Sequence, residues 1–228
     1  MGPARREVRS AEKGEQIVVI GLGRFGGAVA EELTHLGFEV LGIDDDGAQV
    51  QYYADILTHV VQADATSEEV LRQLDVGDFR HAVVGIGADI EASVLTTSAL
   101  VDVGVRNIWA KALTTAHGRI LERVGAHHVV FPEHEMGHRV AHLVGGAVID
   151  WFQLDEEFAM VETLVPDHLV GRTLDDMGLR ARYGVTVVCV KPPGQRFTYA
   201  TPETVLDRGT VLVVAGPSDK AQQFAQLA

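Results

Sequence analysis

Residues 17–26, IVVIGLGRFG, decide the fold of this 228-residue chain. The four aliphatic residues that open the stretch are typical of a strand buried on both faces of a parallel sheet. Gly21, Gly23 and Gly26 then fit the pattern G-x-G-x-x-G, whose glycines permit a tight turn, the approach of phosphates to the backbone and close packing of a helix on the strand. Backbone N–H groups at the start of that helix attract anions. The stretch therefore predicts a nucleotide-binding strand–loop–helix unit.

Two charged residues refine this prediction. Asp44 ends the second predicted strand, where a carboxylate hydrogen-bonds a ribose diol and repels a 2′-phosphate, which disfavours NADP. Arg24 adds a full charge and a rigid guanidinium to the start of the helix, which favours two or three grouped phosphates over the single pyrophosphate of NAD. The glycine pattern alone does not distinguish NAD, ATP, ADP and AMP, because they share the adenosine and the first phosphates.

Short aliphatic runs alternate with helix-like stretches as far as residue 132. The helix expected near residue 66 opens on Thr66-Ser67-Glu68-Glu69, which fits a capping box. Alternation at this spacing predicts an α/β fold, a Rossmann-like doubly wound parallel sheet with helices on both faces. We expect strands at 17–20, 39–44, 59–61, 82–86, 107–111 and 128–131, and helices at 28–36, 66–74, 90–103 and up to Gly125.

The remaining residues change pattern twice. Apolar residues repeat at helical intervals over 135–151, so a helix is expected whose stripe contacts its own domain or a second copy of the chain. Residues 155–228 then mix strand-like and helix-like runs, which is typical of a small α+β domain. The stripe comprises Val140, Leu143, Val144, Ala147, Val148 and Trp151; the later strands are expected at 158–165, 185–190 and 210–215, and the later helices at 174–183 and 218–227. The predicted organisation is a flexible arm (1–15), a nucleotide-binding domain (16–134), a helix (135–154) and a small domain (155–228).

Composition excludes several classes of protein. Lys and Arg total 19 against 32 Asp and Glu, a net charge of −13 that repels phosphate backbones and argues against a general nucleic-acid binder. The single cysteine, Cys189, excludes an internal disulfide and fits a reducing cytosol. No apolar run approaches the ~18 residues that span a bilayer, and the start of the chain has no apolar core of a signal peptide. We therefore expect a cytosolic protein.

An enzymatic role is disfavoured by the same reasoning. An NAD-dependent oxidoreductase needs a substrate pocket with an acid or base facing the nicotinamide. Only a helix and a small domain follow the predicted sheet, and no His–Asp or Lys–Tyr arrangement stands out. The oxidoreductase stays as an alternative to a binding protein.

A family resemblance emerges from six motifs in one order. They are IVVIGLGRFGGAVAEEL, GIDDD, QADATSEE, GIGADIEASVLTT, IWAKA and FPEHEMG. From about residue 16 onwards the chain resembles the RCK (KTN) proteins, specifically the KtrA/TrkA-type cytosolic regulatory subunits of bacterial Ktr potassium uptake systems. The resemblance implies a non-enzymatic gating subunit that ATP activates and ADP inactivates. It also implies a crossover helix at 135–154, homodimers assembled into an octameric ring, and peripheral attachment to a KtrB-like channel subunit on the cytoplasmic face of the membrane.

The resemblance also implies roles for individual residues. Arg24 matches an arginine at the terminal phosphate, Asp44 an acid at the ribose, and Glu133 a glutamate associated with a divalent or monovalent cation near the terminal phosphate. The segment after the fifth strand is expected to approach the ligand. The full expected set is Gly21, Gly23, Arg24, Phe25, Gly26, Asp44, Asp45, Asp64, Ala65, Ile86, Gly87, Ala88, Lys111, Ala112, His117 and Glu133, with Glu133 as the metal ligand and no catalytic residue.

Two alternatives concern the signal that the chain senses. An NAD(H)-responsive, TrkA-like subunit keeps the fold and the partner but changes the nucleotide. The small domain is similar to RCK C domains, which implies cyclic di-AMP as a second ligand. That similarity depends on Leu174, Leu179, Arg180, Tyr183 and Gly184. Residues 1–15 do not follow the family pattern.

Three histidines form a separate signal. His134, His138 and His142 fall at i, i+4 and i+8 of the predicted helix, a spacing that suits a transition-metal site, with His138 and His142 alone supplying two ligands. No cysteine and no metalloprotease signature accompanies them, which favours an ordinary polar helix face.

Overall fold

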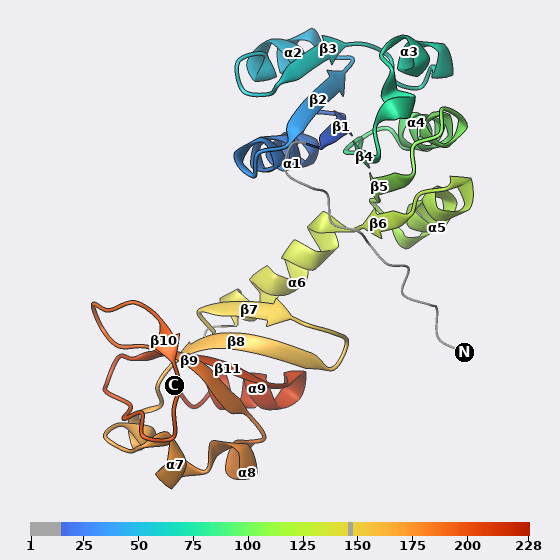
Figure 1. Cartoon of the computed structure of the whole chain (residues 1–228). Coiled ribbons are helices and arrows are strands. Elements are labelled where there is room, and N and C mark those ends of the chain that lie inside the picture. The colour runs from blue at the N-terminus through green and yellow to red at the C-terminus, as the bar shows by residue number, and fades with distance from the viewer. Residues whose placement is uncertain (1–14, 146–147) are drawn as a thin grey trace. The chain divides into compact units, whose positions relative to one another are not determined.

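The computed structural model describes residues 15–145 and 148–228. The chain divides into two compact units, the first ending at Glu133 and the second running from His134 to Ala228 (Figure 1). Almost all of the expected flexible arm, and Ala147 of the expected apolar stripe, lie outside the described residues. Within these, no helix is long and apolar enough to cross a membrane.

The first unit is built on a parallel sheet of six strands in the order β3-β2-β1-β4-β5-β6. This order confirms the predicted doubly wound, Rossmann-like fold. The strands are β1 (Gln16–Ile20), β2 (Glu39–Asp44), β3 (His59–Gln62), β4 (His81–Val84), β5 (Asn107–Lys111) and β6 (His128–Val130). The helices are α1 (Arg24–His35), α2 (Gly47–Tyr53), α3 (Glu68–Gln73), α4 (Ile90–Asp102) and α5 (Thr115–Val124), with a 3-10 turn η1 (Val76–Asp78).

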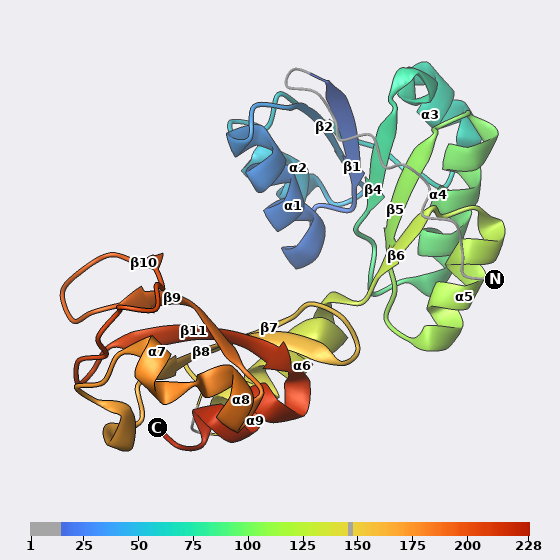
Figure 2. The same ribbon diagram turned by 60° about the horizontal axis from the view of Figure 1, so that its bottom comes forward.

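Successive side chains of β1 enter two different cores, because side chains alternate across a strand. Ile17 and Val19 pack with Ala30 of α1 and Tyr53 of α2. Val18 and Ile20 pack in the larger core that receives α3, α4 and α5. Helices therefore cover both faces of the sheet, with α1 and α2 on one side and α3 to α5 on the other (Figure 2).

Helix starts differ from the sequence-based expectation in three places. Helix α1 begins at Arg24 rather than at residue 28, directly after its N-cap Gly23. Helix α2 was not predicted, because its short sequence lacks a helical apolar period; Asp46 caps it by accepting from the Ala48 N–H. The expected capping box would use Thr66 as the N-cap of α3, but the side chain that caps this helix is that of Ser67.

The predicted helix over 135–151 is wrong in its second half. Helix α6 spans Pro132–Val144, so Pro132 opens a helix instead of only stopping β6. The chain then enters β7 (Asp150–Gln153), which pairs with the next strand and buries Trp151 in the core of the second unit. Pairing of β7 satisfies backbone groups and buries an indole at the same time, which outweighs the local helical period.

The second unit holds an antiparallel sheet of five strands in the order β10-β9-β11-β8-β7. The helix expected over 174–183 is two helices, because Gly178 turns the chain with a φ of +54°. The remaining elements are β8 (Phe158–Leu164), a 3-10 turn η2 (Asp167–Leu169), α7 (Leu174–Met177), α8 (Leu179–Tyr183), β9 (Thr186–Lys191), β10 (Thr198–Tyr199), β11 (Val211–Pro217) and α9 (Ser218–Ala225). A small α+β domain is confirmed.

Candidate functional site

A cavity of about 330 Å³ opens at the carboxyl ends of β1, β2 and β4. The strand order reverses between β1 and β4, and open α/β sheets bind ligands in the crevice at such a switch point. Predicted residues supply about half of the lining: Gly21, Gly23, Asp44, Asp45, Asp64, Ala65, Ile86, Gly87 and Ala88. The rest of the lining comprises Ile20, Ile43, Ala63, Thr66, Gly85, Asp89, Ala92 and Thr96.

The three motif glycines meet three different steric demands. Gly21 has a φ of +85°, which a residue with a side chain rarely adopts. A Cβ on Gly26 would lie 1.9 Å from the Gly21 carbonyl oxygen, so α1 packs on the loop only with glycine there. A Cβ on Gly23 would meet nothing within 4 Å. Gly23 therefore leaves the loop backbone open to the cavity, as a phosphate-binding loop requires.

Asp44 joins the loops after β1 and β2. Its Oδ2 accepts a hydrogen bond from the Leu22 N–H at 2.5 Å, and its Oδ1 accepts from the Asp46 N–H at 2.9 Å. Each carboxylate oxygen has a second lone pair that remains available to a ligand hydroxyl. The carboxylate is thus held in place at the cavity edge before any ligand arrives.

Asp64 shapes the turn after β3. Its Oδ1 accepts from both the Thr66 hydroxyl and the Thr66 N–H. The side-chain hydrogen bond, followed by the backbone one, lowers the pKa of Asp64 below its usual value. Ala65, between them, is buried against the core, so this turn presents a fixed wall to the cavity.

A group of charged residues lies beside the cavity rather than in its lining. The Lys111 Nζ lies 2.5 Å from Glu133 Oε1 and 5.7 Å from the centre of the Phe25 ring. The hydrogen bond from Lys111 lowers the pKa of Glu133, and the charge of Arg24 contributes in the same direction. Gly87 connects this group to the cavity, since a Cβ on it would lie 2.9 Å from the Lys111 Nζ.

Ala112 and His117 are placed by the structure in the protein interior. Ala112 belongs to the larger core, and His117 is buried near the start of α5. Its Nδ1 accepts from the Leu113 N–H at 3.3 Å, and burial lowers the pKa of the imidazole. Neither residue is part of the cavity lining.

Thr96 is the most informative lining residue that the sequence reasoning missed. It is fully buried in α4, and its hydroxyl has no hydrogen-bond partner among the described residues. The neighbouring Thr97 hydroxyl donates to the Ser93 carbonyl at 2.8 Å. Ala92 and Thr96 are four residues apart on one helix face, and Asp89 caps that helix through the Ala92 N–H. The i, i+4 spacing of Ala92 and Thr96 in the helix that follows the loop after β4 could have indicated that both residues face the cavity.

The cation expected at Glu133 is not supported by a cluster of protein ligands within the described ranges. In the parts of the chain that the structure describes, no three His, Cys, Asp or Glu side chains gather into a metal site. Glu133 is exposed and forms an ion pair with Lys111. A cation there would need oxygen ligands from a nucleotide or from a second copy of the chain.

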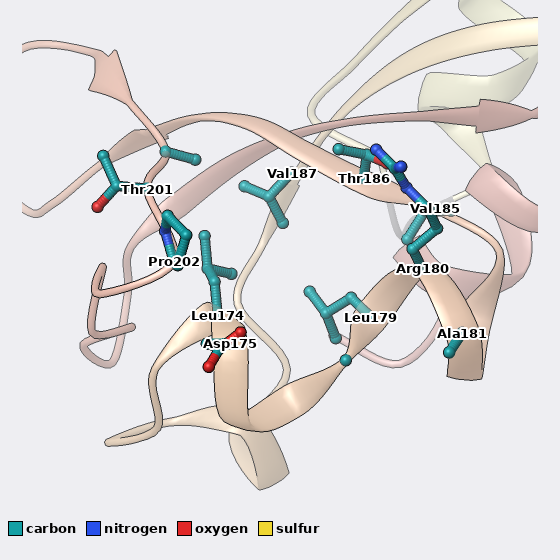
Figure 3. Close-up of a pocket in the computed structure, with 12 residues that line it drawn as sticks. Leu174, Asp175, Leu179, Arg180, Ala181, Val185, Thr186, Val187, Thr201 and Pro202 are labelled. Atoms are coloured by element: carbon teal, nitrogen blue, oxygen red, sulfur yellow. The ribbon is translucent and has the colours of Figure 1, made fainter.

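The second unit has a cavity of its own, of about 410 Å³ (Figure 3). Leu174, Leu179 and Val187 form its apolar floor, and Arg180 contributes a guanidinium at one end. The Arg180 Nε donates to the Thr186 hydroxyl at 3.0 Å, which holds the side chain along the cavity. The cavity therefore combines an apolar surface with one fixed cation.

Comparison with known proteins agrees with this architecture. Residues 17–132 match the TrkA-N domain and residues 159–228 the TrkA-C domain. The chain is 38% identical over 211 residues to the Ktr system potassium uptake protein C of Bacillus subtilis (strain 168), which covers 92% of this chain and 96% of that protein.

Two solved structures share the fold at 19% identity. The GsuK RCK domain superposes with a TM-score of 0.64 over 96% of this chain and 48% of that chain. The GsuK channel bound to NAD gives the same TM-score over 96% of this chain and 40% of that chain. This chain thus spans less than half of either GsuK chain, and at this identity the likeness concerns the fold alone. From the two domain matches and the Bacillus relative, the chain belongs to the TrkA-N/TrkA-C family of RCK proteins, which includes the Ktr system potassium uptake proteins.

Proposed function

We propose that this chain is a nucleotide-binding regulatory subunit of a potassium uptake system and carries out no catalysis of its own. The observation that supports this most strongly is the cavity at the switch point, where open backbone at Gly23 faces the preorganised carboxylate of Asp44. The relative from Bacillus subtilis, similar over nearly its whole length, is a potassium uptake protein. The chain would act in the cytoplasm, docked on a KtrB-like membrane subunit.

The proposed signal is the number of phosphates on an adenine nucleotide. The ribose would bind Asp44, the first phosphates the backbone at Gly23, and the terminal phosphate would reach Arg24 and Lys111. Support comes from Gly87, which lines the cavity and leaves no room for a side chain beside the Lys111 ammonium. A third phosphate would compete with Glu133 for the Lys111 ammonium, and a cation at Glu133 would then offset the added negative charge.

The proposed response is a shift between two shapes of an octameric ring of homodimers, in which ATP favours the conducting state and ADP the inactive one. A ligand shifts such an equilibrium only as far as its affinities for the two shapes differ. Helix α6 supplies a contact between copies, because Met136, Val140 and Val144 are exposed on it and Val144 is 80% exposed. The three side chains are spaced at i, i+4 and i+8, so they form one apolar stripe, and contiguous exposed apolar surface marks interaction sites.

NAD(H) is the alternative signal. The GsuK channel has been solved bound to NAD, and the carboxylate of Asp44 suits the ribose diol of either nucleotide. An NAD-dependent oxidoreductase is the weaker alternative. Three carboxylates of the lining, those of Asp44, Asp64 and Asp89, accept hydrogen bonds from backbone N–H groups, which fits structural roles better than general acid or base catalysis.

The cavity of the second unit is the proposed site for cyclic di-AMP as a second, inhibitory ligand. Its apolar floor suits a purine, and the Arg180 guanidinium suits a phosphodiester. The acidic Asp175 in the same lining restricts where a phosphate would lie.

Titration calorimetry with the untagged full chain tests the proposal. We expect ATP and ADP to bind the wild type, and Arg24→Ala to weaken ATP about 10- to 100-fold while ADP changes less, since hydrogen bonds to charged groups contribute about 1.5–3 kcal/mol. Arg106→Ala, also at an exposed arginine, should leave both affinities unchanged. NADH and cyclic di-AMP are titrated in parallel. Equal losses for ATP and ADP would refute the sensing role of Arg24, and absence of adenine-nucleotide binding would refute the function.

A further inference from the structure

Two histidines on α6 have their ring nitrogens close together. The Nε2 atoms of His134 and His138 lie 3.3 Å apart, and their ring centroids are 4.4 Å apart. Both side chains are exposed in the single chain. With both Nδ1 nitrogens protonated, each Nε2 carries a free lone pair, so the two neighbouring nitrogens can both serve as ligands.

His142, the third histidine at this spacing, makes a different contact. Its ring lies flat on the Trp151 indole, with centroids 3.7 Å apart and planes 5° apart. This stack holds the His142 imidazole against the Trp151 indole of β7, whereas the hydrogen-bond contact of His138 is with His134. The structure thus distinguishes two histidine pairs that have the same i, i+4 spacing in the sequence.

The 3.3 Å separation has a chemical meaning. Two nitrogens that each lie about 2.05 Å from a zinc ion at the tetrahedral angle are about 3.3 Å apart. The pair therefore already has the spacing of two neighbouring corners of a tetrahedral site, and binding an ion requires little rearrangement of the side chains.

We propose that His134 and His138 hold one transition-metal ion of the zinc class (Zn²⁺, Ni²⁺ or Cu²⁺), with water in the remaining positions. Imidazole nitrogen prefers these borderline metals, whereas Mg²⁺ and Ca²⁺ prefer oxygen. The site is chemically distinct from the cation expected at Glu133, and it does not depend on nucleotide binding. No third His, Cys, Asp or Glu joins the pair among the described residues, which implies moderate affinity.

The bound ion would connect two successive turns of α6. A chelate between positions i and i+4 forms only while the intervening residues are helical, so metal binding stabilises the helix over Pro132–Val144. Helix α6 also spans the sequence boundary between the two compact units. A metal ion here would stiffen the segment that follows the nucleotide-binding unit.

Calorimetry with NiCl₂ and ZnCl₂ on the untagged chain tests the site, and His134→Gln is the decisive variant. It leaves His138 and His142 intact, the pair that sequence spacing alone would also select. We expect one ion per wild-type chain and an affinity loss of about 10²-fold in both His134→Gln and His138→Gln, because each variant removes the second, intramolecular ligand. His35→Gln, at an exposed histidine of α1, should bind as the wild type does.

Retained affinity in His134→Gln would overturn the assignment in favour of His138 and His142. Half an ion per chain would overturn it in favour of a site between two copies. Weak binding that neither variant changes would show that the ions bind nonspecifically to surface histidines, and the proposed site would be wrong. Amide hydrogen exchange gives a second readout, since ZnCl₂ should slow exchange in α6 of the wild type and not in His138→Gln.

Discussion

The ammonium of Lys111 lies 2.5 Å from the carboxylate of Glu133, and this ion pair joins the end of β5 to the first turn of α6. Lys111 is 9% exposed whereas Glu133 is open to solvent. A mostly buried ammonium needs a partner, and Glu133 is the partner it has in this structure. A phosphate arriving past Gly87 would therefore meet a cation that is already engaged.

Glu133→Gln tests this competition. Without the carboxylate, Lys111 is free for the phosphate and a repulsive charge is removed, so ATP affinity in EDTA should rise about fivefold. The increase in ATP affinity on adding MgCl₂ should shrink at the same time, because the proposed cation loses its protein ligand. Calorimetry in EDTA and in MgCl₂ measures both effects, with the exposed Glu135→Gln as the control. Unchanged values in both buffers would remove Glu133 from the site.

Gly23→Ala should impair nucleotide binding, whereas Gly26→Ala should impair stability. The Gly23 backbone has a φ of −63° and a Cβ would meet nothing, so alanine fits without a clash. The smaller entropy of the unfolded chain favours alanine and the N-cap position favours glycine, so stability should change by less than about 1 kcal/mol. Its methyl group would occupy the approach of the phosphates, and ATP affinity should fall more than about tenfold. Gly26→Ala places a Cβ 1.9 Å from a carbonyl oxygen, so it should destabilise the fold by about 1–3 kcal/mol or more. Urea unfolding and calorimetry separate the two, and normal ATP binding by Gly23→Ala would contradict a phosphate at this loop.

Thr96→Val should separate binding from stability. The Thr96 hydroxyl has no partner in the described part of the chain, so its removal should not lower the urea midpoint. If a bound nucleotide or its water uses this hydroxyl, ATP affinity should fall about fivefold, the value of one ordinary hydrogen bond. Thr97→Val is the matched control, since it removes a buried hydrogen bond to Ser93 away from the cavity and should cost about 1 kcal/mol of stability with binding unchanged. Wild-type affinity in Thr96→Val would show that the hydroxyl plays no part in recognition.

Stability should fall as the pH is lowered from 7.5 to 5.5. Burial lowers the pKa of His117, and burial likewise lowers the pKa of His81. The unfolded imidazoles take up protons near pH 6.5, whereas the folded rings stay neutral to lower pH, so the unfolded state binds more protons in this window. Urea midpoints at the two pH values measure the difference, and His117→Asn should make it smaller. A difference of the same size in His117→Asn as in the wild type would exclude His117 as a source.

Most of the first unit could be predicted from the sequence because its signals are local. The strands β2 and β5 have the predicted bounds, and the glycine loop has the predicted steric roles at Gly21 and Gly26. A continuous aliphatic run identifies a strand buried on both faces, and a glycine pattern identifies a backbone that cannot carry side chains. Neither inference requires knowledge of distant residues.

The errors arose where distant packing overrides a local period. Trp151 continued the helical repeat in the sequence, yet pairing of β7 with β8 buries it in the second unit. Helix α2 had no apolar period and forms because Asp46 caps it and Tyr53 packs against α1, where the Tyr53 hydroxyl leaves room only for a glycine at Gly27. Tertiary contacts decide such short elements, since propensity contributes only tenths of a kcal/mol per residue.

The order of aliphatic runs and glycines along the chain was thus enough to specify the nucleotide-binding sheet and the edge at which its cavity opens. Which side chains meet at that edge was decided only by the tertiary structure: Thr96 in the lining, Lys111 against Glu133, and His134 rather than His142 beside His138. The physical reason is one of range. Hydrophobic periodicity and backbone sterics are encoded within a few neighbouring residues. A hydrogen bond or an ion pair instead depends on atomic positions that the packing of the whole unit sets to within a fraction of an ångström.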